Sequence, residues 1–231
     1  MAMIYNNSSD FLINSCAWCP WCMQWPGAYC VQTRTGCCKP TTGSPARDFN
    51  ISDFSVYNAT TNTLVSRCNS KAPFDPNKCP STDGKKGWKN IWKKSGACSG
   101  LEEKAFFETA LTFRSRINPL VRLKAENIEP DFGLYGVKAI TNVFKEGINA
   151  TPLVQCSMGP SKFGKFQLYK LYFCASEDGT FIDCPIDPEI GCPAKEVVFY
   201  PFQTWMLKQS AAYDAADASR RPLRASRRRH R

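Results

Sequence analysis

The sequence predicts an α+β fold with a central antiparallel sheet, on three observations. Apolar residues first recur with helical spacing, since Phe106, Ala110 and Phe113 lie at i, i+4 and i+7. From residue 165 onward the period changes to two, in a run of aromatic and aliphatic residues. Cysteines are abundant, 13 in 231 residues, and are spread along the chain. Helices grouped ahead of strands favour α+β over an alternating α/β fold.

The first helix is expected to begin after Ser99. Ser99 and Glu102 have the spacing of a capping box, in which each side chain satisfies a free backbone N–H of the other residue. Pro119 is expected to end this helix. The tryptophan- and lysine-rich stretch 88–99 would then lie just ahead of a rigid helix, a suitable place for a site. A second helix is predicted over residues 137–146.

A central strand is predicted over residues 165–174. This segment is rich in aromatic residues and apolar on both faces, which is typical of a strand buried on both sides. Shorter strands are predicted over residues 181–184 and 197–199. Together they form the antiparallel sheet on which the helices pack.

Length and composition indicate one folded unit. With 43% hydrophobic residues in 231 positions, the chain can bury one full core and is short for two domains. No run of about 18 apolar residues is present, so a membrane-spanning helix is not expected. The chain is expected to be a monomer without a membrane partner.

The cysteine content predicts disulfides and therefore an oxidising compartment. The sequence holds one histidine, His230, so a Cys/His zinc site has little support, and we expect no metal or cofactor. Asn-x-Ser/Thr triplets are glycosylation acceptors if the chain is secreted; they begin at Asn6, Asn7, Asn50, Asn58 and Asn149. Residues 1–22 lack the continuous apolar segment of a signal peptide.

The cysteine-rich start, with Cys16, Cys19 and Cys22, has two interpretations. It is either a metal or redox C-x-x-C motif or an altered first strand. We favour the strand, because no fourth ligand is evident and Pro20 would interrupt the ladder of a central strand.

Several segments resemble the T2 ribonuclease family of secreted plant S-like and self-incompatibility ribonucleases. Residues 23–30 read MQWPGAYC, where the family carries QQWPGxYC, and the following Cys-Cys pair matches Cys37 and Cys38. Residues 90–98 read NIWKKSGAC, where the family carries HEWxKHGTC. Residues 51–56 read ISDFSV in place of IHGLWP. Residues 167–174 and 199–202 match the QLYxxYxC and FxPF segments.

The resemblance implies a T2-like domain over residues 24–202, between an atypical start at 1–23 and an arginine-rich, disordered tail at 203–231. It also implies five disulfides: Cys30–Cys37, Cys38–Cys79, Cys68–Cys98, Cys156–Cys192 and Cys174–Cys184. Cys16, Cys19 and Cys22 are left over. Each closed loop would add roughly 2–4 kcal/mol of stability.

The resemblance also implies a chemistry. Family members cleave RNA by attack of the ribose 2′-hydroxyl on phosphorus, which needs a base and an acid, and histidine suits both. Here the histidine positions hold Ser52, Asn90 and Ser95, and the glutamate position holds Ile91. Serine and asparagine have no titratable proton in the useful range. We therefore expect the chain to be catalytically inactive.

RNA remains a candidate partner through two features. Lys94 is retained at the family's lysine position and Gln24 matches a residue near its base sites; Lys94 either attracts a phosphate or is a solvated charge. The last thirteen residues hold seven arginines, and without them the net charge of +10 falls to +3. That tail either binds nucleic acid through its charge or resembles an import signal, or it is an incidental extension.

The predicted function is thus a ribonuclease-related, secreted protein with a storage, structural or weak RNA-binding role. One alternative is an active secreted endoribonuclease that forms 2′,3′-cyclic phosphates. A further alternative is the translation of a decayed gene.

Overall fold

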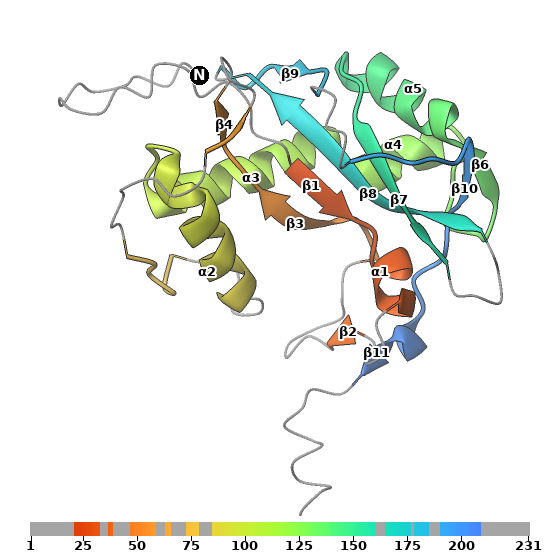
Figure 1. Cartoon of the computed structure of the whole chain (residues 1–231), viewed down its shortest axis with the longest axis horizontal. Coiled ribbons are helices and arrows are strands. Elements are labelled where there is room, and N and C mark those ends of the chain that lie inside the picture. The colour runs from red at the N-terminus through yellow and green to blue at the C-terminus, as the bar shows by residue number, and fades with distance from the viewer. Residues whose placement is uncertain are drawn as a thin grey trace, which may run out of the picture.

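A long central strand, β8 (Phe166–Ala175), organises the molecule (Figure 1). The structure is a computed structural model that describes residues 21–32, 37–38, 47–58, 63–65, 73–78, 85–159, 165–176, 178–184 and 190–208. In that part of the chain, six further strands join β8 in one sheet: β1 (Trp21–Gln24), β3 (Asn50–Phe54), β6 (Leu134–Gly136), β7 (Leu153–Met158), β9 (Phe181–Ile182) and β10 (Glu196–Val198).

The pairing in this sheet is antiparallel with one exception. β3 pairs with β1, and β1, β7 and β9 each pair with β8, all antiparallel. β10 pairs with β6 antiparallel but runs parallel to β8, with Val198 opposite Gln167. The α+β class and the central, mainly antiparallel sheet are therefore confirmed. β8 begins and ends one residue later than expected.

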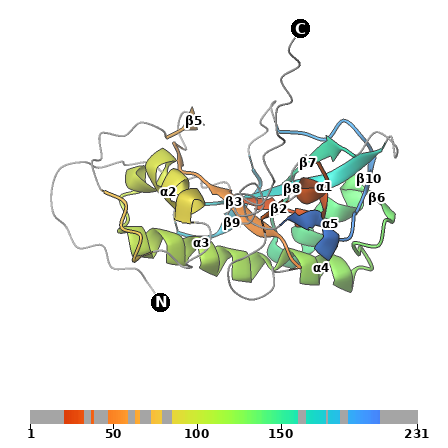
Figure 2. The same ribbon diagram turned by 90° about the horizontal axis from the view of Figure 1, so that it is seen from below.

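Three helices lie on one side of the sheet: α3 (Glu103–Ile117), α4 (Pro119–Ala125) and α5 (Val137–Ile148) (Figure 2). The core forms between them and the strands. Phe144 of α5 meets Phe173 of β8 edge to face, with ring centroids 4.9 Å apart. Phe106 of α3 stacks on Phe54 of β3 at 4.5 Å. These contacts confirm that the aromatic stripe of α3 belongs to the core.

The expected capping box is wrong. α3 begins at Glu103, and its cap residue, Glu102, makes no side-chain capping hydrogen bond. The Ser99 hydroxyl instead donates to the Gly96 carbonyl at 2.6 Å and accepts from the Leu101 N–H at 3.1 Å. Ser99 thus closes the short 3₁₀ turn η1 (Gly96–Cys98), and its hydroxyl cannot cap a helix four residues further on.

Pro119 ends one helix and begins another. α3 stops at Ile117, and Asn118 adopts a left-handed conformation with φ of 41°. Pro119 then takes the first position of α4, where its missing N–H costs nothing. The sequence pattern predicted the end of α3 and missed α4.

The remaining helices, α1 (Pro26–Gln32) and α2 (Lys85–Lys94), come from segments not predicted to be helical. In α2, Trp88, Ile91 and Trp92 have i, i+3, i+4 spacing, and Ile91 and Trp92 are buried. Burial of large aromatic side chains outweighs the helix penalty of about 1 kcal/mol for the glycine at position 87. The stretch 88–99 does lie ahead of a helix, α3, but its first part, residues 88–94, is itself helical.

Disulfides and short strand pairs connect segments outside the main sheet. Cys30–Cys37, Cys156–Cys192 and Cys174–Cys184 are formed, as expected. Cys98 is also disulfide-bonded, whereas the predicted Cys38–Cys79 and Cys68–Cys98 pairs include Cys68 and Cys79, outside the described residues. The remaining short elements are β2 (Cys37–Cys38), β4 (Tyr57–Asn58), β5 (Thr63–Leu64), η2 (Thr204–Met206) and β11 (Leu207–Lys208).

The expected disordered tail begins too early at residue 203, because Thr204–Met206 and Leu207–Lys208 form η2 and β11, and β11 pairs with β2. The predictions for residues 1–20 and 209–231 are not tested, because these segments lie outside the described part. Cys16, Cys19 and the arginine-rich tail belong to these segments. In the part of the chain that the structure covers, no helix combines the length and the apolar character needed to cross a membrane.

Candidate functional site

The first candidate segment is strand β3, which carries Ser52. β3 pairs with β1, so that Asp53 lies opposite Cys22, and a bulge follows at the Cys22–Met23 step. The Ser52 hydroxyl is 3.0 Å from Cys22 Sγ and 3.2 Å from the Cys22 carbonyl oxygen, to which it donates. Ser52 is thus held against the neighbouring strand.

Cys22 is a free thiol, and its side chain is only 1% exposed. Burial raises the pKa of this thiol, and the hydrogen bond from Ser52 and the charge of Lys170 only partly offset that effect. A buried thiol with a raised pKa stays protonated and is a poor nucleophile. Burial likewise raises the pKa of the nearby Tyr172 hydroxyl.

The second candidate segment is the end of α2 and the turn that follows. Its four candidate residues face in different directions. Asn90 is exposed, whereas Ile91 is buried and belongs to the hydrophobic core. Ser95 is fully buried, and its hydroxyl has no hydrogen-bond partner among the described residues. Lys94 alone of this set turns toward β3.

An ion pair joins the two segments. The Lys94 ammonium donates to Asp53 Oδ2. The other oxygen of Asp53 accepts the Phe54 N–H at 2.9 Å and the Ser55 hydroxyl at 3.1 Å. Asp53 therefore holds Lys94 by charge and is itself fixed by the two residues that follow it at the end of β3. Asp53 is not among the residues that the sequence motifs predict for the site.

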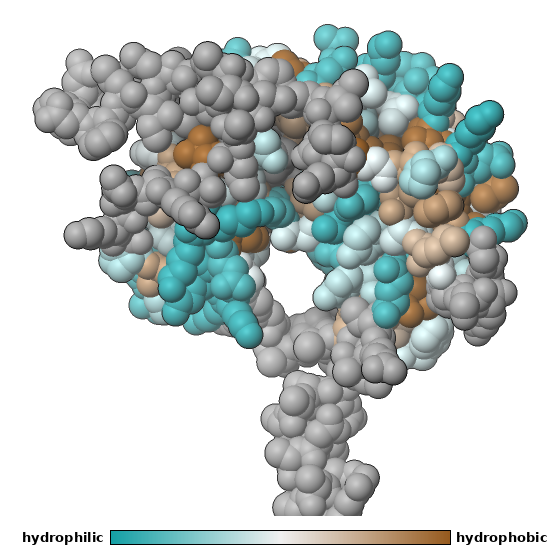
Figure 3. Space-filling view, in the orientation of Figure 1, coloured by the Kyte–Doolittle hydropathy of each residue, from teal (hydrophilic) through white to brown (hydrophobic). Residues whose placement is uncertain are grey.

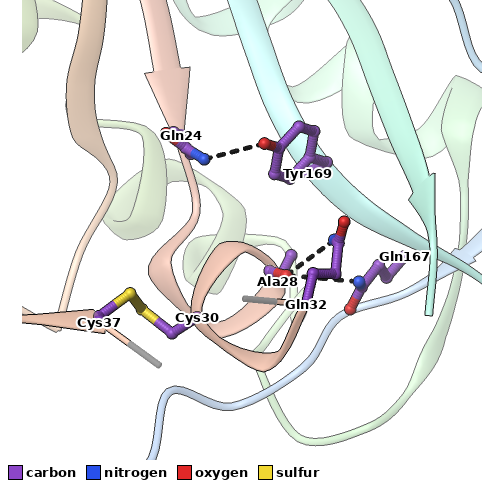
Figure 4. The surroundings of a disulfide bond; sticks show 7 residues. All are labelled: Gln24, Ala28, Cys30, Gln32, Cys37, Gln167 and Tyr169. Carbon is purple, nitrogen blue, oxygen red and sulfur yellow. Dashed lines mark hydrogen bonds between the residues drawn. A yellow bond between two sulfur atoms is a disulfide. The ribbon is translucent and has the colours of Figure 1, made fainter. Parts of the chain in front are cut away.

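A third element of the site is the end of β1. Gln24 donates from Nε2 to the Tyr169 hydroxyl at 3.1 Å (Figure 4). β7 pairs Gln155 with Lys170 and Cys156 with Leu168, which leaves Tyr169 unpaired in a bulge. Bulges re-aim side chains. The Lys170 ammonium lies 5.2 Å from the Tyr169 ring centroid, so an aromatic ring, an amide and a cation come together here.

In the space-filling view a hollow separates the polar surface of α2 from the region of α1 (Figure 3). Across the described ranges, no group of three or more His, Cys, Asp or Glu residues is placed to hold a metal ion.

Comparison with protein families decides the identity of this fold. The family model described as "Ribonuclease T2 family" matches residues 19–184. The chain belongs to the ribonuclease T2 family.

Curated T2 relatives share about a third of its residues. The chain is 35% identical over 199 residues to "Intracellular ribonuclease LX" of Solanum lycopersicum, covering 78% of this chain and 82% of the relative. It is also 35% identical over 189 residues to "Extracellular ribonuclease LE" of the same plant, with 73% and 80% covered. A "Ribonuclease-like storage protein" of Panax ginseng is 30% identical over 191 residues, with 73% and 77% covered.

Solved T2 structures superpose on most of the chain. RNase NT in complex with 5′-AMP aligns with a TM-score of 0.71 at 34% identity, covering 80% of this chain and 98% of that one. Ribonuclease MC1 from the seeds of bitter gourd aligns with a TM-score of 0.66 at 22% identity, covering 79% and 100%, which supports the fold.

The site differs from the T2 motifs in the residues at its proton-transfer positions. Ser52 stands at the first histidine and Asp53 at the neighbouring glycine of IHGLWP. Of the residues predicted for the site, Lys94 pairs with Asp53, the residue that follows Ser52 in β3, while Ser52 itself bonds to Cys22. Ile91 and Ser95 point into the core, and Asn90 points to solvent. Asp53, an acidic residue where the motif has glycine, is the feature of the sequence that could have indicated the ion pair.

Proposed function

We propose that this chain is a T2 ribonuclease family protein that does not cleave RNA. The observation that carries the proposal is the ion pair between Lys94 and Asp53, beside a Ser52 hydroxyl held by Cys22. The family's lysine is thereby neutralised, and the first histidine position offers only a hydroxyl.

Among the described residues close to Ser52, no group is suited to supply the missing proton transfer. Around Ser52, burial raises the pKa of the Cys22 thiol and of the Tyr172 hydroxyl, which moves both away from neutrality. Asp53 is engaged by Lys94 and Ser55. Each acid–base group typically contributes about 10²–10⁴-fold, so loss of both lowers the rate by about 10⁴–10⁸-fold.

A storage or structural role fits such a chain, because it needs the fold and not the chemistry. The relative from Panax ginseng carries the name of a storage protein. The disulfides fit a secretory route, and we propose that the chain is extracellular or resides in the secretory pathway. Weak nucleotide binding near Gln24 and Lys170 is compatible with this role, since the similar RNase NT was solved with 5′-AMP.

The alternative is an active endoribonuclease, as the names of other relatives indicate. Purified, oxidised protein incubated with RNA between about pH 4 and pH 8 distinguishes the two, because family chemistry needs an acid–base pair in that range. We expect no 2′,3′-cyclic phosphate ends above buffer. A Ser52→Ala/Lys94→Ala variant is the control. Cleavage by the natural chain that this variant lacks would refute the proposal, and equal cleavage by both would identify a contaminant.

A further inference from the structure

The replacement at the first histidine position completes an acceptor motif for a sugar. Ser52 stands where IHGLWP has histidine, and with Asn50 and Ile51 it forms the triplet Asn-Ile-Ser. Asparagine becomes an acceptor for N-linked oligosaccharide when a hydroxyl residue stands two positions later, and histidine has no hydroxyl. The change that removes a proton-transfer group from β3 therefore also supplies a modification motif at the same place.

Asn50 lies where the fold can carry a bulky group. It is the first residue of β3, and its side chain is exposed. Among the described strands, β3 is the last in the order of the sheet and pairs with β1 (Figure 1). An oligosaccharide is large and hydrophilic and needs a surface position. A glycan on Asn50 would meet that requirement without displacing a core side chain.

The register of the sheet places Asn50 beside the third element of the candidate site. Asn50 lies opposite Gln24 of β1, and Gln24 lies opposite Lys170 of β8. Residues directly opposite one another share a face of the sheet. At about 4.8 Å per strand, Asn50 is about 5 Å from Gln24 and about 10 Å from Lys170. Gln24 in turn donates to the Tyr169 hydroxyl (Figure 4).

This polar row faces away from the core. The adjacent row along the strands places Met23 opposite Leu171, and both side chains are fully buried. Since successive side chains of a strand point to opposite faces, the row of Asn50, Gln24 and Lys170 lies on the other face. A glycan on Asn50 therefore extends over the candidate site and not over α3, α4 and α5 (Figure 2).

The acceptor is available before the sheet is complete. In the folded chain the Ser52 hydroxyl donates to the Cys22 carbonyl, so a transferase would have to engage it earlier. β8, the other partner of β1, begins at Phe166. About 115 residues must still be added after Asn50, which takes roughly 6–23 s at about 5–20 residues per second. The motif is thus present in a chain whose central strand has not yet been made.

We propose that Asn50 carries an N-linked oligosaccharide that covers the Gln24 end of the candidate site. The Asn50 amide Nδ2 attacks C1 of an oligosaccharide held on a lipid diphosphate. The new C–N bond replaces the bond from C1 to the diphosphate oxygen; the lipid diphosphate leaves with the bonding electrons, and Nδ2 releases one proton. The donor belongs to the secretory pathway, so the modification rests on the secretory route proposed above. A chain that does not cleave RNA tolerates a covered site.

The experiment follows the full-length chain, secreted from cultured plant cells behind an added leader peptide. Non-reduced peptides are mapped by mass spectrometry before and after enzymatic release of N-linked glycans. Asn50→Gln and Ser52→Ala should each abolish the glycan, whereas Ser52→Thr keeps the hydroxyl and should keep it. Asn149, at the end of α5, starts an acceptor triplet that does not involve Ser52, so its occupancy should be equal in all four chains.

The same peptide map separates this proposal from the secretory route. We expect most molecules of the natural chain to carry the glycan on Asn50 and to contain the Cys174–Cys184 disulfide. An unmodified Asn50 in chains with that disulfide would overturn the glycan proposal alone. An unmodified Asn50 in chains whose cysteines stay reduced would overturn both. Neither result depends on whether the chain cleaves RNA.

Coverage of the site has its own measurement. A bulky amine-reactive reagent should label Lys170 several-fold more slowly in the glycosylated chain than in Asn50→Gln, because the sugar begins two strands away on the same face. Lys124 of α4 is exposed and lies among the helices, so it should react equally in both chains. Equal labelling of Lys170 in the two chains would overturn the claim that the glycan covers the site.

Discussion

At the scale of single residues, two of the positions that align with the family's catalytic residues serve the fold. Ile91 is buried in the core, and Ser52 bonds to the neighbouring strand. Asp53 changes the role of Lys94, which matches the family's lysine position, because it engages Lys94 in an ion pair. Such a pair is partly exposed and adds little stability, typically below about 1 kcal/mol. Its main effect is to reduce the positive charge that Lys94 can offer to a phosphate.

Ser95 and Ser52 should respond to alanine with opposite signs. The Ser95 hydroxyl is buried without a partner, and an unpaired buried hydroxyl costs roughly 1–3 kcal/mol. Ser95→Ala should therefore raise the free energy of unfolding by about 1 kcal/mol. Ser52→Ala removes a hydroxyl bonded to Cys22 and should lower it by about 0.5–1.5 kcal/mol. Urea denaturation measures both, and a destabilising Ser95→Ala would show that this hydroxyl is satisfied.

At the scale of elements, α2 and the turn after it depend on close packing between tryptophan and glycine. Gly96 lies so near the Trp92 ring that an added Cβ would meet it, and would lie 2.9 Å from Phe106 Cε1. The glycine is thus required by the approach of two aromatic rings. Gly87, in the first turn of α2, has nothing within 4 Å of such a Cβ.

These two glycines give a matched pair of variants. Gly87→Ala should stabilise the protein by about 0.4–1 kcal/mol, because alanine narrows the unfolded ensemble and favours a helix. Gly96→Ala should destabilise it by about 1–3 kcal/mol through overpacking. Thermal unfolding of both variants checks the signs. Tolerance of alanine at position 96 would mean that Trp92 is packed more loosely than the structure shows.

The strength of the apolar periodicity explains why the sequence predicts α3 but not α2. α3 and β8 have strong periodicity, and both were found with small boundary errors. α2 was missed because a glycine and several lysines obscure a helical stripe of only three apolar residues. Pro119 indicates the end of α3, but a proline at this position also suits the first turn of a helix, and α4 begins there. The ion pair of Asp53 with Lys94 spans 41 residues of sequence, and only the sheet register and the placement of α2 bring it together.

At the scale of the whole molecule, buried groups predict sensitivity to alkali. Burial raises the pKa of the Cys22 thiol above its ordinary value of 9.0. Well below pH 9.0 both the folded and unfolded chains keep the proton, and this group does not affect stability. Between that value and the raised folded pKa only the unfolded chain releases it, so the free energy of unfolding should fall by about 1.4 kcal/mol per pH unit.

The measurement is urea denaturation at several pH values from neutral to about 10.5, where thiol and tyrosine ionise. Burial also raises the pKa of Tyr169 and Tyr172, so part of the decline should persist without the thiol. In the Cys22→Ala variant, the free energy of unfolding should fall less steeply with pH, by the contribution of about one proton. Identical slopes for the natural chain and this variant would contradict the assignment of Cys22 as a buried, protonated thiol.

The central claim is that the T2 fold is kept here without its cleavage chemistry. The most direct test is the rate at which the folded, oxidised chain cleaves a dinucleotide, measured beside an active T2 ribonuclease at equal concentration. Loss of both acid–base groups predicts a rate at least about 10⁴-fold lower, with no optimum between about pH 4 and pH 8. A rate within about a hundredfold of the active enzyme, with a bell-shaped pH profile and lost in Ser52→Ala/Lys94→Ala, would contradict the account.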